Sequence, residues 1–344
     1  MRVVVVGATG NVGTSLLEAL GRDESVESVL GLARRLPDAA YAKTTFAAVD
    51  IARDDLVPHF RGADCVVHLA WAIQPSRDRK LLRAVNVDGS KRVFDAVADA
   101  GAPKLVAASS IGVYSPGPKT PVDESWPREG VPTSWYARHK AEMERLLDRL
   151  EAARDVRVVR LRPALITKRE SAEEVRRLFT GPLLPSPLVR PGRLPFFPHV
   201  PGAVVQVVHS RDVGEAYRLA VTKDVSGAFN VASDPPLDGR TVAESIGARA
   251  VPVAPGLARA LASAAWHARL QPTSPDWLDL ALGVPLLDWT RAREELGWQP
   301  RHGALETVRE LLQGLADGAS GRTPPLRRGD RGSEVAAGVG SRPL

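Results

Sequence analysis

The sequence predicts an α/β fold, with a doubly wound parallel sheet followed by a smaller C-terminal α/β region. Three observations predict it. Short β-branched apolar runs alternate with helical patterns through the first half, a glycine-rich turn joins the first run to the first helical pattern, and proline becomes dense after about residue 180. The 344 residues, 44% hydrophobic and 25% charged, suffice for one large domain and a smaller second region.

The expected strands follow one another with helical patterns between most of them. Arg2–Val6 is an apolar, β-branched run of the kind that is buried on both faces of a parallel sheet. Strands are also expected at 29–33, 45–49, 64–70, 104–109 and 156–161, and long helices at 81–100 and 135–153. Strands separated by helices imply right-handed crossovers, so the sheet is expected to be of the Rossmann type.

The pattern changes after Pro163, where residues 180–202 are too rich in proline to form regular structure throughout. Strands at 204–209 and 228–231 and a helix at 210–221 then resume the alternation, and helices follow at 257–270, 277–282, 290–296 and 304–315. We expect a Rossmann domain of residues 1–165 with returning segments near 204–232, and a substrate-binding region of 166–203 and 233–316. Residues 317–344 offer little to bury and are expected to form a disordered tail.

Composition argues against several classes of partner and site. The formal net charge is +6, but the basic residues are scattered among acidic ones, so no nucleic-acid partner is expected. Cys65 is the single cysteine, which excludes an internal disulfide, and no metal-ligand cluster is present, so no metal site is expected. With no apolar run long enough to span a bilayer and no signal peptide, we expect no membrane association and a cytoplasmic location.

A glycine-rich turn follows the first strand directly and opens the first helix. It reads Gly7-Ala-Thr-Gly10-Asn-Val-Gly13. A chain that must turn sharply and let a diphosphate approach its backbone at a helix N-terminus needs positions without side chains. The turn therefore predicts a dinucleotide site, with contacts from Gly7, Thr9, Gly10, Asn11, Val12 and Gly13.

The end of the second strand bears on the choice between NAD and NADP. It reads Gly31-Leu-Ala-Arg34-Arg35, with no carboxylate before Asp38. A carboxylate here would hold the ribose hydroxyls of NAD and repel a 2′-phosphate, whereas an arginine pairs with that phosphate. Arg34 is the candidate for this contact, which slightly favours NADP over NAD. The alternative is an arginine that is merely exposed on a loop.

Tyr136 and Lys140 are candidates for acid/base chemistry. Their four-residue spacing places the phenol and the ammonium on one face of the helix 135–153. A nearby ammonium is expected to lower the phenol pKa toward a useful range. Ser110 leaves the end of the strand 104–109, at the sheet edge where open α/β sheets bind ligands. The alternative is that Tyr136 and Lys140 are ordinary residues of an amphipathic helix.

The glycine spacing, Tyr136-x-x-x-Lys140 and Ser110 together resemble the extended short-chain dehydrogenase/reductase superfamily, the NAD-dependent epimerase/dehydratase family. The resemblance runs from residue 1 to about residue 315. It implies that Tyr136 exchanges the hydroxyl proton, Ser110 polarises the carbonyl, and Lys140 holds the ribose and tunes Tyr136. It also implies further cofactor contacts, listed in chain order as Asp50, Ile51, Leu69, Ala70, Trp71, Asn86, Tyr136, Lys140 and Pro163.

The segment after Pro163 bears on the class of substrate. Sugar-nucleotide members of the family carry an Asn and Tyr-Gly-Pro where this chain has Ala164-Leu-Ile-Thr-Lys168. We therefore expect a small, fairly hydrophobic carbonyl or secondary alcohol, with residues 180–202 as a wall of the pocket; Arg190 and Arg193 instead suit an anionic group. Two alternatives stay open: a sugar-nucleotide epimerase or dehydratase, and a non-enzymatic dinucleotide sensor, against which the intact Ser110, Tyr136 and Lys140 argue. The resemblance also implies a homodimer formed through helices 81–100 and 135–153.

Overall fold

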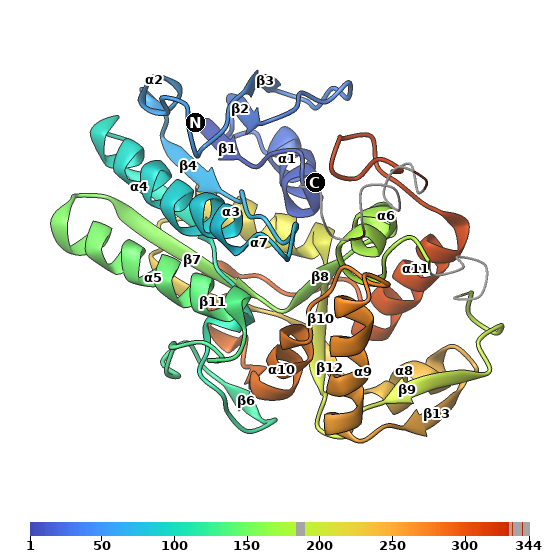
Figure 1. Cartoon of the computed structure of the whole chain (residues 1–344). Helices are drawn as coiled ribbons and strands as arrows, with labels where there is room; N and C mark the ends of the chain where they lie inside the picture. Colours follow the sequence, from blue (N-terminus) through green and yellow to red (C-terminus); the bar gives the residue numbers. More distant parts are fainter. Residues whose placement is uncertain (184–189, 330–331, 333–338, 340–344) are drawn as a thin grey trace.

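A computed structural model describes residues 1–183, 190–329, 332 and 339. Its centre is a seven-stranded sheet, parallel throughout, in the order β11-β7-β5-β4-β1-β2-β3 (Figure 1). In chain order the strands are β1 (Arg2–Val6), β2 (Ser28–Ala33), β3 (Thr44–Ala48), β4 (Cys65–His68), β5 (Lys104–Ala108), β7 (Arg157–Pro163) and β11 (Gly227–Val231). This is the predicted Rossmann-type sheet.

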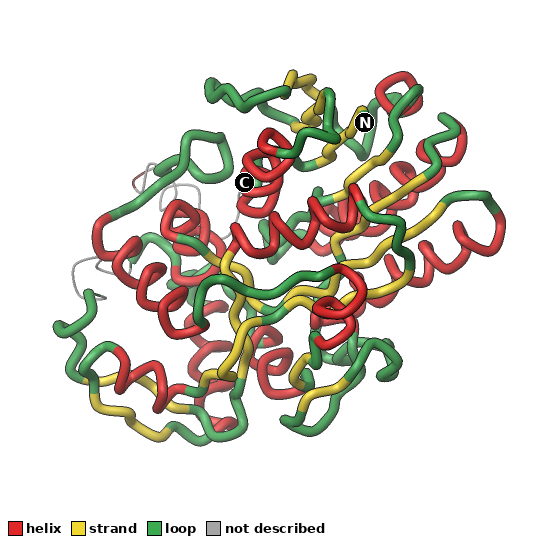
Figure 2. The backbone as a smooth tube through the Cα atoms, turned by 180° about the vertical axis from the view of Figure 1, so that it is seen from behind, coloured by secondary structure: helices red, strands yellow, loops and turns green. Residues whose placement is uncertain are grey.

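Helices cover both faces of the sheet (Figures 1 and 2). Val3 and Val5 of β1 face the cluster that includes α1 (Asn11–Arg22) and α7 (Ser210–Thr222), whereas Val4 and Val6 face the cluster that includes α2 (Val57–Phe60), α4 (Ser90–Asp99) and α5 (Trp135–Ala153). All four valines are at most 1% exposed. A strand whose alternate residues enter two different cores reads as a continuous apolar run, which is why the sequence pattern of β1 is unambiguous.

The expected helix 81–100 is interrupted. It consists of α3 (Arg79–Arg83), a π-helical turn (Ala84–Gly89) and α4. The Ser90 hydroxyl donates to the Asn86 carbonyl at 2.7 Å, and the Asn86 side chain bonds the backbone of Ala72, so a contact outside the helix holds the wider turn. Because π-turns are often found at functional sites, the interruption indicates that the segment around Ala72, which Asn86 holds, belongs to such a site.

The second region surrounds one end of the main sheet. It contains a three-stranded sheet of β12 (Ser233–Leu237), β10 (Val205–His209) and β8 (Leu165–Thr167), and two-stranded sheets of β13 (Arg249–Pro252) with β9 (Phe196–His199) and of β14 (Leu286–Leu287) with β6 (Pro121–Val122). Its helices are α6 (Ala172–Val175), α8 (Gly239–Ser245), α9 (Pro255–His267), α10 (Asp276–Gly283) and α11 (Ala304–Asp317). Of the two returning strands, β11 joins the main sheet and β10 joins the three-stranded one.

The start of the expected disordered tail is folded. The chain after α11 packs back onto the protein as far as residue 329, with Thr323 0% and Leu326 2% exposed. Composition alone missed this because one buried threonine and one buried leucine give no pattern in a segment rich in glycine, proline and arginine. The rest of the tail lies outside the described residues except for 332 and 339, as do Leu184 and Leu188 of the proline-rich segment.

The described residues show neither a membrane-spanning helix nor a metal-binding cluster. None of the helices in this part of the chain combines the length and the apolar character that crossing a membrane requires. Among the same residues, no group of three or more His, Cys, Asp or Glu side chains is arranged to hold a metal ion.

Candidate active site

The glycine turn between β1 and α1 is built for close backbone approach. Gly7 has φ +86°, and a Cβ on it would lie 2.7 Å from the Ala70 nitrogen. A Cβ on Gly13 would lie 2.5 Å from the Ala8 carbonyl oxygen. No side chain caps the N-terminus of α1, so the first amides of the helix remain available to an anion. These features fit a dinucleotide diphosphate at the turn.

A cavity of about 190 Å³ lies beside this turn. The predicted cofactor residues that line it come from the ends of four neighbouring strands, namely Gly7, Thr9, Gly10, Arg34, Asp50, Ile51, Leu69, Ala70 and Trp71. Arg35 also lines it. The other predicted cofactor residues, Asn11, Val12, Gly13, Asn86, Tyr136, Lys140 and Pro163, lie outside this lining. The structure thus gathers around one cavity the residues that were predicted to contact the diphosphate and the adenosine of the cofactor.

The opposite wall of the cavity comes from residues that the sequence analysis missed. Glu174, Leu178 and Pro325 line it from the second region and the C-terminal segment. Burial raises the pKa of Glu174 to about 7. A carboxyl with this pKa is about half protonated at neutral pH and repels a diphosphate less than a fully charged one, so Glu174 is compatible with an anionic ligand there.

Lys168 is another residue that the sequence analysis did not assign to the cofactor side. Its Nζ lies 3.1 Å from the Asn11 carbonyl oxygen, 2.7 Å from the Thr14 hydroxyl and 2.9 Å from the Ser15 hydroxyl, all on the first turns of α1. The residue is 4% exposed, and burial lowers its ammonium pKa. A buried cation therefore sits against the helix end that faces the glycine turn. Position 168 stood out in the sequence only as a departure from the family pattern.

Asn86 supports the cavity wall. Its Nδ2 donates to the Ala72 carbonyl at 2.8 Å, and its Oδ1 accepts from the Ala72 amide at 2.7 Å. Both halves of the side-chain amide are thus used on the segment that follows β4 and lines the cavity. The predicted contact between Asn86 and the cofactor stays a prediction.

Ser110 and Tyr136 meet at the end of β5. The Ser110 hydroxyl and the Tyr136 ring both lie beside Gly112; the hydroxyl lowers the pKa of the phenol and accepts a hydrogen bond from the Gly112 amide at 3.0 Å. Ser134 caps α5 by accepting from the Ala137 amide, which fixes the start of the helix at Trp135. A Cβ on Gly112 would lie 2.9 Å from the Tyr136 ring, so the glycine leaves room for the phenol beside the serine.

Protonation at this pair differs from the expectation. Burial raises the pKa of Tyr136 to about 12, and the Ser110 hydrogen bond only partly offsets the rise. Burial also lowers the pKa of Lys140 to about 7. The Lys140 Nζ donates to the Ala108 carbonyl at 2.6 Å and lies 3.6 Å from the Trp71 ring centre, but 6.0 Å from the Tyr136 ring centre. The phenol is therefore protonated at neutral pH.

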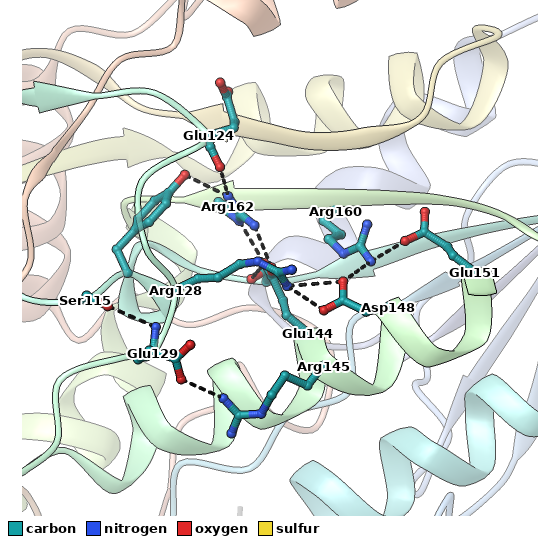
Figure 3. A network of polar contacts seen from close by, with 12 residues as sticks. Ser115, Glu124, Arg128, Glu129, Glu144, Arg145, Asp148, Glu151, Arg160 and Arg162 are labelled. Atoms are coloured by element: carbon teal, nitrogen blue, oxygen red, sulfur yellow. Dashed lines mark hydrogen bonds and ion pairs between the residues drawn. The ribbon is translucent and has the colours of Figure 1, made fainter. Parts of the chain in front are cut away.

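Glu144 joins the helix of Tyr136 and Lys140 to two strands (Figure 3). It accepts from the Ser109 hydroxyl at 2.5 Å and from Arg162 at 2.8 and 2.6 Å, and both ionic side chains are at most 3% exposed. Burial raises the pKa of Glu144, but the hydrogen bonds and charge of Arg162, the Ser109 hydroxyl and the charge of Arg160 together outweigh burial and hold this pKa below its usual range. The signal in the sequence was a carboxylate one turn beyond Lys140, on the buried face of the helix.

Aromatic rings surround the Tyr136 phenol. The Trp277 ring lies 4.9 Å from the Tyr136 ring between centres, Trp71 lies at 5.9 Å and Trp135 at 6.2 Å, and Phe179 packs edge-on against Trp277 at 5.0 Å. Sequence reasoning missed Trp277 and Phe179, because their elements meet Tyr136 only in the tertiary structure.

The proline-rich segment contributes less than expected in its described part. Phe196 of β9 is 59% exposed, and β9 pairs with β13. Arg190 forms an ion pair with Asp317 at 3.0 Å. Arg190, one of the two arginines expected to suit an anionic group, is therefore already paired. The Phe179 ring, just before the segment, packs against Trp277, which in turn lies against Tyr136.

The fold is of the Rossmann class, and the glycine turn with the cavity beside it fits a dinucleotide. Residues 3–232 match the model of the NAD dependent epimerase/dehydratase family, and the chain belongs to this family. The family predicted from the glycine turn and the Ser110, Tyr136 and Lys140 pattern is thereby confirmed.

Curated relatives include an uncharacterized protein of Mycobacterium tuberculosis, 29% identical over 314 residues, which cover 90% of this chain and 30% of the relative. The chain thus spans about a third of the length of the relatives that match it first. The 3-diazoavenalumate denitrifying reductase of a Streptomyces species is 28% identical over 88% of this chain and 97% of its own.

Among solved structures, the Thermus thermophilus UDP-glucose 4-epimerase complex with NAD has a TM-score of 0.68 at 23% identity and covers 92% of this chain and 99% of its own. MoeE5 in complex with UDP-glucuronic acid and NAD has a TM-score of 0.67 at 20% identity, covering 92% of this chain and all of its own. At these identities the likeness establishes the shared fold.

Proposed function

We propose that the protein is an NAD(P)-dependent oxidoreductase that interconverts a small carbonyl and its secondary alcohol, with Tyr136 as the acid/base. The observation that carries the proposal is that the Ser110 hydroxyl and the Tyr136 phenol lie together beside Gly112 at the end of β5, with a phenol that is protonated at neutral pH. Such a pair suits proton delivery to a carbonyl oxygen as the carbon is reduced. Membership of a family of NAD-dependent enzymes supports it.

The roles of the residues follow from their chemistry. A bound nicotinamide supplies or accepts the hydride. Ser110 hydrogen-bonds the carbonyl oxygen and polarises the bond, and Tyr136 transfers its phenolic proton to that oxygen as the carbon gains the hydride. Lys140, fixed by the Ala108 carbonyl, keeps a partly charged amine on the cofactor side of Tyr136.

The rings around Tyr136 favour an apolar substrate. Trp71 and Trp277 present aromatic surface beside the phenol, and Phe179 packs behind Trp277. Ala164 stands where sugar-nucleotide members of the family have an amide. Few polar groups and much aromatic surface are typical of pockets for small hydrophobic ligands. We therefore propose a small hydrophobic carbonyl or secondary alcohol.

For the cofactor, Arg34 and Arg35 both line the dinucleotide cavity, which supports a contact with a 2′-phosphate. On this basis we propose NADP as slightly preferred over NAD. A cytoplasmic location and a homodimer stay predictions.

The second candidate is a sugar-nucleotide epimerase, which the solved structures of similar fold favour. An epimerase returns the hydride to its own substrate, so it needs no added nicotinamide, whereas an oxidoreductase consumes the cofactor in proportion to product.

The experiment that tests the proposal follows NADPH and NADH oxidation against a panel of small hydrophobic ketones and aldehydes, with UDP-glucose incubated separately without added cofactor. We expect carbonyl-dependent oxidation, faster with NADPH. Tyr136→Phe removes the proton donor and is expected to lower kcat by at least about 100-fold while cofactor affinity changes little. Epimerisation of UDP-glucose with no added nicotinamide, together with no carbonyl reduction, contradicts the proposal.

A further inference from the structure

The chain beyond α11 folds back over the cofactor side of the molecule. Gly318 ends α11 with φ +64°, the Ala319 amide donates to the Gly314 carbonyl at 2.8 Å, and the segment returns past α6 (Figure 1). We call residues 321–328 the C-terminal strap. It closes on itself, because the Gly321 amide donates to the Leu326 carbonyl at 2.8 Å, and the Leu326 and Arg327 amides donate to the Thr323 carbonyl at 2.9 and 3.0 Å.

The strap is bonded directly to the glycine turn. The Thr323 hydroxyl donates to the Thr9 carbonyl at 2.7 Å, and Thr323 is 0% exposed. Thr9 lies between Gly7 and Gly10 and lines the dinucleotide cavity with both of them. Breaking a buried hydroxyl–carbonyl hydrogen bond leaves both groups without a partner until water reaches them. This bond therefore resists separation of the strap from the turn.

The other side of the strap is held by the second region. The Arg177 guanidinium donates to the carbonyls of Arg327, at 2.7 Å, and of Pro325. Arg177 belongs to the π-helical turn Arg176–Thr180, which also carries the cavity residue Leu178. Arg327 pairs with Asp38 beyond β2, but both side chains are about half exposed or more, so this pair adds little.

Through Pro325, the strap forms part of the wall of the dinucleotide cavity. It lines the cavity together with Gly7, Gly10 and Arg34. The cavity is therefore bounded on one side by the phosphate-binding turn and on another by the strap, and the buried Thr323 hydroxyl ties the two together.

We infer that the C-terminal strap is part of the cofactor site: it covers the diphosphate of the bound dinucleotide, and the Thr323–Thr9 hydrogen bond must open before the dinucleotide leaves. The inference rests on a dinucleotide in this cavity, as in the proposed function, and is independent of the substrate and of the hydride-transfer step.

Cofactor release tests the inference. Two shortened chains are compared with the full chain, one ending at Ser320, which lacks the strap, and one ending at Gly329, which keeps it. Release of NADPH into excess unlabelled NADP is followed by stopped-flow fluorescence. We expect release about tenfold faster from the chain ending at Ser320, and an unchanged rate from the chain ending at Gly329. Equal release rates for all three chains overturn the inference.

A point variant tests the same bond without shortening the chain. Thr323→Val keeps the shape of the side chain and removes the donor, whereas Thr323→Ser keeps the donor as the matched control. We expect release about fivefold faster for Thr323→Val and near the full-chain rate for Thr323→Ser. Wild-type release from Thr323→Val contradicts the inference.

Hydrogen exchange without cofactor gives a readout independent of binding and turnover. The Leu326 and Arg327 amides are expected to be protected in the full chain and to exchange faster in Thr323→Val. If they exchange at the rate of an unfolded peptide in the full chain, the strap is not closed and the inference fails. If the strap is closed but the protein reduces no carbonyl, the proposed reaction is wrong and the inference about the strap is unaffected.

Discussion

At the scale of single residues, burial sets the protonation of the two groups on the first turns of α5. Burial raises the pKa of Tyr136 to about 12 and lowers that of Lys140 to about 7, because both charged forms lose water. The two shifts favour a neutral phenol beside an amine that is charged in only part of the population at neutral pH. This state suits proton donation to a carbonyl.

Lys140 gives the stability a pH dependence. An amine whose pKa is lower in the folded than in the unfolded protein binds fewer protons when folded. The free energy of unfolding therefore rises with pH between the folded pKa of about 7 and the ordinary lysine pKa of 10.5. Lys140→Met removes this contribution. The wild type gains stability with rising pH through Lys140 and the variant does not. The free energy of unfolding of the variant minus that of the wild type is therefore expected to decrease as the pH rises from about 6 to about 9. Urea denaturation measures both values. The exposed Lys80→Met is the control, and a pH-independent difference for Lys140→Met contradicts the prediction.

Glu144 shows what a single buried partner contributes. Glu144→Gln leaves the Arg162 guanidinium buried without its counter-charge. We expect a loss of about 3 kcal/mol in the free energy of unfolding, with a lower kcat because Ser109, next to Ser110, loses its charged acceptor.

The matched control for this prediction lies on the same helix. Glu142 pairs with Arg83, and the two side chains are 30% and 49% exposed. Glu142→Gln is expected to cost under about 1 kcal/mol. Equal losses for the two variants, measured by urea denaturation, contradict the role given to Glu144.

At the scale of elements, strands and helices meet the cofactor through their ends. The β1–α1 turn supplies backbone amides, the ends of β2 to β4 supply cavity-lining side chains, and the π-turn between α3 and α4 holds the segment after β4. Most of these elements were predictable. Helix 135–153 has the same bounds in sequence and structure, because an apolar face and a Ser134 cap define it locally. The π-turn was not predictable, since its cause is a bond between Asn86 and Ala72 across the fold.

The glycine turn makes a prediction at this scale. A Cβ on Gly13 would stand 2.5 Å from the Ala8 carbonyl oxygen, so Gly13→Ala forces the turn to move. We expect the Kd for NADPH, measured by fluorescence titration, to rise at least about tenfold with the fold intact by circular dichroism. Gly256→Ala, in α9 with nothing within 4 Å of the added carbon, is the control. Unchanged affinity in Gly13→Ala counts against the phosphate site.

At the scale of the whole molecule, the second region completes the cofactor site of the first. Lys168 reaches α1 from the end of β8, Glu174 and Leu178 line the cavity, and the C-terminal strap bonds the glycine turn. The two regions therefore share one site, and a change in either is expected to alter cofactor affinity.

Lys168 tests this coupling. Lys168→Met keeps much of the side-chain volume and removes a buried cation next to the first turn of α1. We expect dinucleotide affinity to fall about tenfold, as for the loss of one nearby charge at an effective dielectric constant of about 20, while the free energy of unfolding does not fall. The exposed Lys80→Met is the control. Lys168→Met with wild-type affinity for NADPH would rule out the role proposed for this cation.

The sequence by itself determined the main sheet, the glycine turn and helix 135–153, because strand periodicity, turn chemistry and helix capping act over a few residues, and its motifs indicated the family. Only the tertiary structure decided that Glu144 is paired by Arg162, that Lys168 lies against α1, that Trp277 stacks beside Tyr136 and that Thr323 closes on Thr9. Each of these contacts joins distant parts of the chain through one or two side chains. Such contacts leave no local period in the sequence, since their energy is realised only when the whole chain has packed.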